Sequence, residues 1–170
     1  MSKPFKYILG VLGILLALVL VYIFMGLFTP KTHHGSVMIH LSSTPEKVWE
    51  DITAIEGLPQ RRPDSLEVKV TGINDQGYKM WREYTAMDDS IDAEITEELS
   101  QQKVVMHRQA INSDFTSQWV YELTPTSDTQ TDLTITEDST TTNLFLRAWM
   151  TLRGRNSTLN EEIISLKNSL

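Results

Sequence analysis

Three patterns of apolar and polar residues divide the chain into three parts. Residues 7–28 form an uninterrupted apolar run of 22 residues without a charged side chain. Residues 36–140 alternate apolar and polar side chains in short runs, which is the period of half-buried β-strands. Residues 144–168 repeat apolar side chains at steps of three and four, which is the period of an amphipathic helix. The pattern predicts a long apolar helix, a β-rich middle and a long C-terminal helix.

The middle part begins with a strand and a short helix. Residues 36–41 alternate and predict a strand, after which Thr44 and Pro45 are residue types favoured at a helix N-cap and first position. Pro59 and Pro63 then prevent a long second helix. Turn-forming residues separate six further strand-like runs, and such short connections favour an antiparallel meander. The six predicted strands are 66–73, 78–86, 91–99, 104–111, 115–123 and 133–140.

Alternation within these strands predicts which residues face the core. The inward sets are Leu66, Val68 and Val70, then Ile91, Ala93 and Ile95, then Trp119, Tyr121 and Leu123, then Leu133 and Ile135.

The C-terminal helix is predicted as one continuous element, with Thr142 or Asn143 as its cap. Gly154 lies in its middle, at a cost of about 1 kcal/mol relative to alanine. A single stripe runs along the whole helix and is apolar except at Asn156. The stripe consists of Phe145, Trp149, Leu152, Asn156, Leu159, Ile163, Leu166 and Leu170.

The N-terminal apolar run is long enough to cross a membrane. At 1.5 Å per residue it spans about 33 Å, slightly more than the roughly 30 Å hydrocarbon core. A cleaved signal peptide is the competing interpretation, but its apolar region is normally about 7–15 residues long and ends at a small-residue cleavage site, and no A-x-A pattern follows this run. The sequence therefore predicts a single-pass anchor over 1–30, a linker over 31–35 and one domain over 36–170.

Charged residues are unevenly distributed along the chain. No Asp or Glu precedes Glu46, and the part after residue 31 carries a net charge of about −10. Such a surface disfavours nucleic-acid partners and an electrostatic grip on anionic lipid. Lys3 and Lys6 precede the apolar run and Lys31 alone follows it closely, so the positive-inside rule predicts a cell-membrane protein with a cytoplasmic N-terminus and an extracytoplasmic domain.

Local phrases and the order of elements resemble the SRPBCC superfamily of START-like and polyketide-cyclase-like proteins. The phrases are STPEKVWEDIT (43–53), GYKMWREYTAMDDSIDAEITEEL (77–99), WVYELTPTSDTQTDLTITED (119–138) and LRGRNSTLNEEIISLKNSL (152–170). They are patterns of apolar and turn residues, so the resemblance implies a fold and no activity. It implies an α+β helix-grip fold (β-α-α-β6-α), in which a curved antiparallel sheet grips the long C-terminal helix. It also implies a cavity between sheet and helix for a lipid, sterol, polyketide or similar apolar molecule. The N-terminal anchor is an addition to the family's usual pattern.

Aromatic side chains and one amide are the candidate lining of this cavity. Aromatic residues are also ordinary core filling, and both roles coincide where a cavity lies inside the core. Asn156 interrupts the apolar stripe, so its amide either meets a ligand or is exposed beyond the edge of the sheet. The ligand-binding candidates are Trp81, Tyr84, Trp119, Tyr121, Trp149 and Asn156.

A few titratable residues are candidates for chemistry. Glu97 and Glu137 have the parity of inward residues, and Arg82 and Arg108 could pair with them at a cavity rim or take part in acid–base catalysis. His107 lies on the face opposite Met106. It is a candidate acid–base residue of the cavity, but an exposed or satisfied imidazole is the simpler interpretation. The chain has no cysteine, and no nucleophile, cofactor or metal-binding motif occurs. We therefore expect no catalytic set, cofactor or metal.

Three functions from different classes remain open. The first is a membrane-tethered cavity that binds a hydrophobic small molecule or lipid, and tethering would raise the effective concentration of a membrane-soluble ligand. The second is an interaction domain of a membrane complex, for which a filled core and an exposed apolar patch would argue. The third is a polyketide cyclase/dehydratase-like enzyme, which requires polar side chains that converge inside the pocket. The sequence favours the first.

Overall fold

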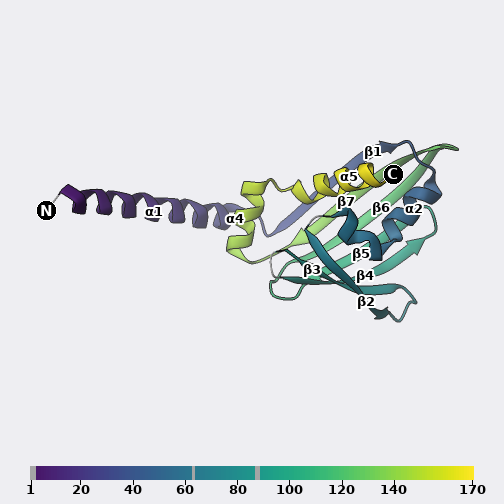
Figure 1. Ribbon diagram of the computed structural model, residues 1–170, viewed down its shortest axis with the longest axis horizontal. Coiled ribbons are helices and arrows are strands. Elements are labelled where there is room, and N and C mark those ends of the chain that lie inside the picture. The colour runs from purple at the N-terminus through teal and green to yellow at the C-terminus, as the bar shows by residue number, and fades with distance from the viewer. Residues whose placement is uncertain (1–2, 63, 87–88) are drawn as a thin grey trace.

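The computed structural model describes residues 3–62, 64–86 and 89–170. A seven-stranded antiparallel sheet forms its main body, with a long helix extending from one end (Figure 1). In chain order the elements are α1 (Lys3–Phe28), β1 (Thr32–Leu41), α2 (Pro45–Thr53), the 3-10 turn η1 (Ile55–Gly57), α3 (Leu58–Arg61), β2 (Ser65–Ile73), β3 (Lys79–Thr85), β4 (Ser90–Leu99), β5 (Lys103–Ala110), β6 (Thr116–Ser127), β7 (Gln130–Thr140), α4 (Leu144–Arg153) and α5 (Ser157–Ser169). The predicted α+β class and the predicted order of strands are confirmed.

The sheet has the strand order β1-β7-β6-β5-β4-β3-β2, so β1 and β2 are its edges. Helix α5 crosses β1 and β7, α2 lies over β6 and β7, and α3 lies beside β2, so these helices cover one face. Gly35 in β1 allows the close approach of α5, because a Cβ at this position would lie 2.6 Å from Leu159 Cδ1. Leu159 and Leu166 of α5 are buried against the inner face.

The predicted inward residues are mostly correct. Trp119, Tyr121 and Leu123 of β6 are buried, as are the inward residues of β7 and two of the three predicted in β4. The prediction for β2 is wrong at Leu66 and Val70, which are exposed, whereas Val68 packs against the core. This strand is an edge of the sheet and its pairing with β3 is interrupted by two register shifts, so a strict alternation of faces is not maintained.

Helix α2 begins where the sequence predicts and leads the chain toward the interior. The Thr44 side chain accepts a hydrogen bond from the backbone N–H of Lys47 at 3.3 Å, and Pro45 is the first helical residue. After η1, the four-residue helix α3 ends at Arg61, and Arg62 has extended backbone angles at its C-cap. This sharp change of direction positions the Arg62 side chain beneath the helical layer.

The C-terminal segment forms two helices, and the prediction of one continuous helix is wrong. Helix α4 ends at Arg153, and Gly154 has φ of +94°, a conformation that L side chains rarely adopt. Helix α5 then begins at Ser157 in a different direction (Figure 1). The predicted stripe is therefore divided. Its α5 part is buried in the core, while Phe145 and Trp149 of α4 are exposed.

Helix α1 projects away from the sheet and packs against α4 (Figure 1). Its segment Tyr7–Phe28 is long and apolar enough to cross a membrane, and none of its apolar window is buried inside the protein. The predicted linker over 31–35 is shorter than expected, because β1 begins at Thr32. Residues 29–31 alone separate the apolar helix from the sheet.

The break between α4 and α5 gives a test with a matched control. Alanine at residue 154 or at residue 57 would place a Cβ in open space, but Gly154 has a positive φ and Gly57 has φ of −84°. We expect Gly154→Ala to lower the free energy of unfolding by about 1–3 kcal/mol through backbone strain. Gly57→Ala should stay within about 0.5 kcal/mol of the wild type. Urea unfolding of the full-length protein in detergent measures both, and equal midpoints would contradict the strain.

Candidate functional site

Four charged side chains and one phenol meet in the interior between the sheet and α5. We call Arg62, Glu83, Arg108, Tyr121 and Glu162 the inner charge cluster. The carboxyl side chains of Glu83 and Glu162 are each 3% exposed, and those of Arg62 and Arg108 are 19% and 14% exposed. They come from α3's C-cap, from β3, β5 and β6, and from α5. Chain segments far apart in the sequence therefore build this site.

The first half of the cluster joins the end of α3 to α5. Arg62 Nε donates to Glu162 Oε2 at 2.6 Å, and the Tyr121 hydroxyl donates to Glu162 Oε1 at 3.1 Å. An Arg62 Nη2 atom lies 3.5 Å from the same hydroxyl. Both oxygens of the Glu162 carboxylate are thus hydrogen-bonded, which a buried carboxylate requires.

The second half lies on the inner face of the sheet. Arg108 Nη2 donates to Glu83 Oε2 at 2.8 Å, and the Trp81 indole donates to Glu83 Oε1 at 3.0 Å. Arg108 on β5 reaches Glu83 on β3 across the intervening strand β4. The residue of β4 between Trp81 and Arg108 is Ala93, whose small side chain leaves the guanidinium room to cross.

Trp119 connects the two halves. The guanidinium carbons of Arg62 and Arg108 lie 5.8 Å and 6.0 Å from its ring centroid, within the range of cation–π interaction. The indole N–H of Trp119 donates to Ser117 Oγ at 3.2 Å. One aromatic ring therefore contacts both cations, and the two ion pairs form a single electrostatic unit.

The pKa shifts indicate that Glu83 and Arg62 are charged. Burial opposes ionisation of Glu83, but Arg108 and Arg62 hold its pKa below the ordinary value. Burial likewise opposes the charge on Arg62, and the facing Glu162 carboxylate raises its pKa. Burial and the neighbouring Glu162 raise the pKa of Tyr121, so its hydroxyl keeps its proton. The cluster therefore contains at least one carboxylate and one guanidinium that the neighbouring opposite charges keep ionised.

Little free space remains inside the cluster. The cavity there has a volume of about 10 Å³, about the room that one water molecule needs. Ligand pockets are usually several hundred Å³ or more, so the cavity is closed in this conformation. Apolar and charged side chains line it from both the helical side and the sheet. The lining residues are Ile52, Ile55, Leu58, Arg61, Arg62, Trp81, Glu83, Met106, Arg108, Tyr121 and Glu162.

A third buried carboxylate, Glu137 of β7, has a different environment. Its side chain accepts a hydrogen bond from the Thr158 hydroxyl at 2.6 Å. Burial raises its pKa, and that effect exceeds the opposing contributions of Thr158, Arg108 and Arg62. The pKa values of Glu137 and Glu83 are therefore shifted in opposite directions within one interior. Such a difference is frequent where carboxyl groups have separate chemical roles.

Three of the six predicted lining residues meet at this site, namely Trp81, Trp119 and Tyr121. Tyr84 lies on the outer face of β3, where the Lys69 ammonium is 4.9 Å from its ring centroid. Trp149 is exposed on α4, and Asn156 is exposed in the turn before α5. Their assignment rested on one unbroken helix, which the turn at Gly154 excludes.

The titratable candidates divide between the two faces of the sheet. Arg108 and Glu137 point inward as predicted, although Glu137 pairs with a threonine rather than an arginine. Glu97 lies outside, because a bulge between Ile95 and Glu97 reverses the alternation, and it pairs with Lys103 at 3.0 Å. Arg82 pairs on the outer face with Asp92.

His107 follows the parity of the outer face, as expected, and lies between two inward residues of β5. It therefore does not reach the cluster, and the acid–base role considered for it has no support from its position.

Sequence reasoning missed three members of the cluster, namely Arg62, Glu83 and Glu162. Two of them carried a signal. Glu83 is two positions from Trp81 and so shares its face of the strand. Glu162 follows Leu159 by three positions and so shares its face of the helix. Arg62 lies between two prolines in a segment without periodicity, and no local pattern indicates its direction.

Solved structures with the same arrangement identify the fold. A START-superfamily protein from Mycobacterium smegmatis is 14% identical, has a TM-score of 0.65, and the match covers 80% of this chain and 95% of that one. The Zhui aromatase/cyclase from a Streptomyces species is 13% identical, with a TM-score of 0.64 and coverage of 81% and 93%. The chain has the helix-grip fold of the START superfamily.

A third similar structure has two domains. The aromatase/cyclase StfQ from the steffimycin biosynthetic pathway is 14% identical, with a TM-score of 0.62, and the match covers 79% of this chain and 44% of that protein. No model of a known protein family and no curated protein matches the sequence. At these identities the likeness concerns the helix-grip fold, and the function must be argued from the site.

Adjacent glutamates in α5 test the first ion pair. Glu162→Gln leaves Arg62 buried without its counter-charge, so we expect the free energy of unfolding to fall by about 3 kcal/mol. Glu161 pairs with Arg153 at the surface, and Glu161→Gln should change it by less than about 1 kcal/mol. Denaturant unfolding of both full-length variants gives the comparison, and similar midpoints would contradict a strong buried pair.

The raised pKa of Glu137 predicts that the stability of the protein depends on pH. Its raised pKa means that folding favours the protonated form, so its contribution to stability is complete below the ordinary pKa of 4.5 and is lost as the pH rises through the raised folded-state value. We expect Glu137→Gln to raise the unfolding midpoint at neutral pH and to have little effect near about pH 4. The exposed Glu122 of β6 is the control, and a difference that does not grow with pH would contradict the shift.

Proposed function

We propose that the protein is a membrane-anchored binding domain for a small amphipathic molecule, which binds at the inner charge cluster beneath α5. The observation that carries this proposal is the convergence of two arginines, two glutamates and a tyrosine inside the core of a helix-grip domain. The helix-grip neighbours include a START-superfamily protein and two aromatase/cyclases, and these names support a small-molecule role.

The composition of the cluster is costly for a purely structural core. Replacement of buried ion pairs by apolar residues of similar volume is often neutral or stabilising by about 1–4 kcal/mol. Ionisable groups with strongly shifted pKa values inside a cleft or core are therefore candidates for function. Here Glu83 and Tyr121 both have shifted pKa values and face the same small cavity.

The closed cavity must open to admit a ligand, and Arg62 is the part best placed to move. Its side chain is the most exposed of the four charged members, and it follows a helix of only four residues. Outward movement of α3 would withdraw Arg62 from Trp119 and Glu162. The vacated space would then border Trp81 and Trp119, whose rings suit an apolar or aromatic body.

The polar end of the ligand follows from the groups left behind. Arg108 Nε is buried and has no hydrogen-bond partner among residues 3–62, 64–86 and 89–170, so it could donate to a carbonyl or hydroxyl oxygen. Withdrawal of Arg62 would free accepting positions on the Glu162 carboxylate, to which a hydroxyl group of the ligand could donate. A hydroxyl- or carbonyl-bearing molecule therefore fits best, with its apolar body against the tryptophans.

The anchor completes the proposal. The span Tyr7–Phe28 would hold the domain beside the bilayer, where a membrane-soluble ligand is concentrated. Lys3 and Lys6 before the span and Lys31 after it favour a cytoplasmic N-terminus and an extracytoplasmic domain.

Two arginines on opposite faces of the sheet provide the test. Arg108 belongs to the cluster, while Arg82 pairs with Asp92 on the outer face. We expect native mass spectrometry of the full-length protein, released from detergent, to show an extractable bound molecule in the wild type and in Arg82→Gln. Arg108→Gln should lose most of it. Solvent extraction then identifies the compound, and a bound compound that is converted on incubation would favour the cyclase-like alternative.

A wild-type protein without excess mass, even after incubation with membrane extract, would overturn the binding proposal. The filled core would then favour an interaction domain. Equal retention by the two arginine variants would instead show that the molecule binds outside the cluster.

A further inference from the structure

We propose that α4 is a second membrane contact, which lies in the lipid–water interface with its apolar face in the bilayer. The inference rests on the membrane anchor of the proposed function and is independent of the inner cavity. The inference assigns a role to α4, which the sequence pattern predicted to be part of the helix packed on the core.

The exposed face of α4 is apolar and continuous. Phe145, Trp149 and Leu152 are spaced four and three residues apart, so they share one face of the helix, and they are 60%, 45% and 58% exposed. The opposite side is held by the protein, where Arg147 and Ala148 are buried. A helix with one buried side and one exposed aromatic side has an unoccupied apolar surface.

Direct contacts fix α4 to the last two turns of α1. The Tyr22 and Phe145 rings stack with centroids 6.2 Å apart, and the Tyr22 hydroxyl donates to the Phe145 carbonyl at 2.8 Å. The hydroxyls of Thr29 and Thr151 are hydrogen-bonded at 2.8 Å. A Cβ on Gly26 would lie 2.2 Å from the Leu144 carbonyl oxygen, so glycine permits this close approach.

These contacts set the depth of α4 relative to the span. Tyr22 lies six residues before Phe28, which is about 9 Å along the axis of α1. Helices at a membrane surface bury their apolar face about 5–10 Å deep. Helix α4 also lies across the end of α1 rather than alongside it (Figure 1), so it would run in the plane of the membrane. Tyr22 lies further from the end of the span than interfacial aromatic residues usually do. Its hydroxyl is nevertheless hydrogen-bonded, to the Phe145 carbonyl of α4.

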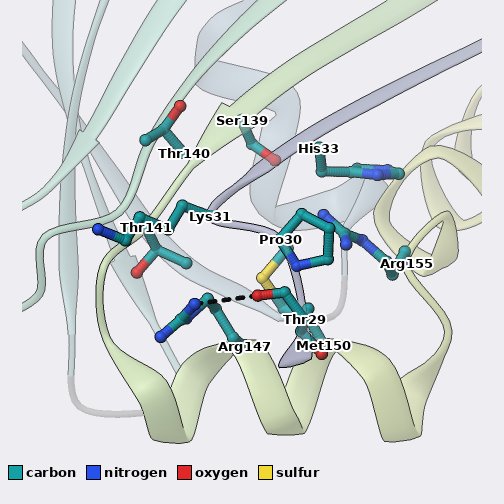
Figure 2. Close-up of a pocket in the computed structure, with 10 residues that line it drawn as sticks. All are labelled: Thr29, Pro30, Lys31, His33, Ser139, Thr140, Thr141, Arg147, Met150 and Arg155. Carbon is teal, nitrogen blue, oxygen red and sulfur yellow. Dashed lines mark hydrogen bonds between the residues drawn. The ribbon is translucent and has the colours of Figure 1, made fainter. Parts of the chain in front are cut away.

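Charge on the domain side of α4 suits lipid headgroups. The small pocket above the helix contains Lys31, Arg147 and Arg155, and its lining includes no carboxylate (Figure 2), although the chain as a whole carries a net charge of −7. Arg147 donates to the Thr29 carbonyl at 2.9 Å, and Arg155 donates to the Thr32 carbonyl at 2.7 Å. Arg147 is buried against the domain, whereas Lys31 is exposed, and an exposed basic residue just outside an apolar helix end is typical of the headgroup region.

The continuity of this surface with the span identifies lipid as its occupant. Phe28, at the end of α1, is 82% exposed, and the Tyr22 and Phe145 rings stack where α1 meets α4, so exposed apolar side chains of the two helices adjoin. Tryptophan at such a boundary is typical of membrane interfaces. With α1 and α4 both in the bilayer, the domain would be held at one orientation rather than on a free tether.

The absence of cysteine from the chain allows a direct measurement. Trp149→Cys and Leu152→Cys each place one spin label on the apolar face, Leu15→Cys labels the middle of α1, and Asn160→Cys labels the exposed side of α5. The full-length variants are reconstituted into vesicles of phosphatidylcholine with a minority of phosphatidylglycerol. Collision of each label with lipid-soluble oxygen and with a water-soluble nickel complex is then measured.

We expect the oxygen-to-nickel accessibility ratio at residues 149 and 152 to exceed that at residue 160 several-fold and to approach that at residue 15. A water-like ratio at 149 and 152 would overturn the lipid contact. Protection from both reagents would also overturn it, because a partner protein or a second copy would then cover the face. A water-like ratio at residue 15 would overturn the anchor itself, whereas loss of the ligand in the mass spectrum would leave this inference intact.

Discussion

The pairing of opposite charges inside the sheet is the constraint on which the interior depends. Arg62, Glu83, Arg108 and Glu162 are removed from water, so each must keep a counter-charge and fill its hydrogen-bonding positions. Arg108 can reach Glu83 because Ala93 is small. The ion pair between Glu162 and Arg62 holds α5 against the end of α3, because the buried Glu162 carboxylate needs a counter-charge. The same matching closes the cavity, since the guanidinium groups of Arg62 and Arg108 line the space between the sheet and α5.

A closed but charged interior has different properties from an empty apolar pocket. An apolar cavity offers a ligand only shape and hydrophobic burial, whereas this one offers donors and acceptors that are already oriented. In the proposed function, a ligand would enter the cavity by replacing the contacts that Arg62 makes with Trp119 and Glu162. Selectivity would come from polar groups left without partners if the wrong molecule bound.

The protein has two apolar regions. One is the core, which encloses the charge cluster between the sheet and α5. The other is the exposed apolar surface of α1 and α4. The turn at Gly154 separates them, because it directs α5 into the core and leaves Trp149 outside. The few residues between Phe28 and β1, with the hydrogen bonds of Thr29, transmit the orientation of α1 to the domain.

Most of the fold could be predicted from the sequence because its signals are local. The apolar span, the N-cap at Thr44 and the turn residues between strands depend on neighbouring residues, and the resemblance supplied their arrangement. Within the site, Trp81, Trp119 and Tyr121 were predicted for the same reason. The prediction of inward faces from alternation was wrong where a β-bulge shifts the register of a strand, as before Glu97.

The tertiary structure alone decided which distant groups meet. Arg62 and Glu162 are 100 residues apart, so no local period relates them. The sequence contained Gly154, but whether a helical glycine is tolerated or ends the helix depends on where the flanking faces find partners. For Leu159 that partner is the sheet, and for Leu144 it is α1. Local patterns determined the elements of this protein, and long-range packing decided which of their faces are buried, paired or left exposed.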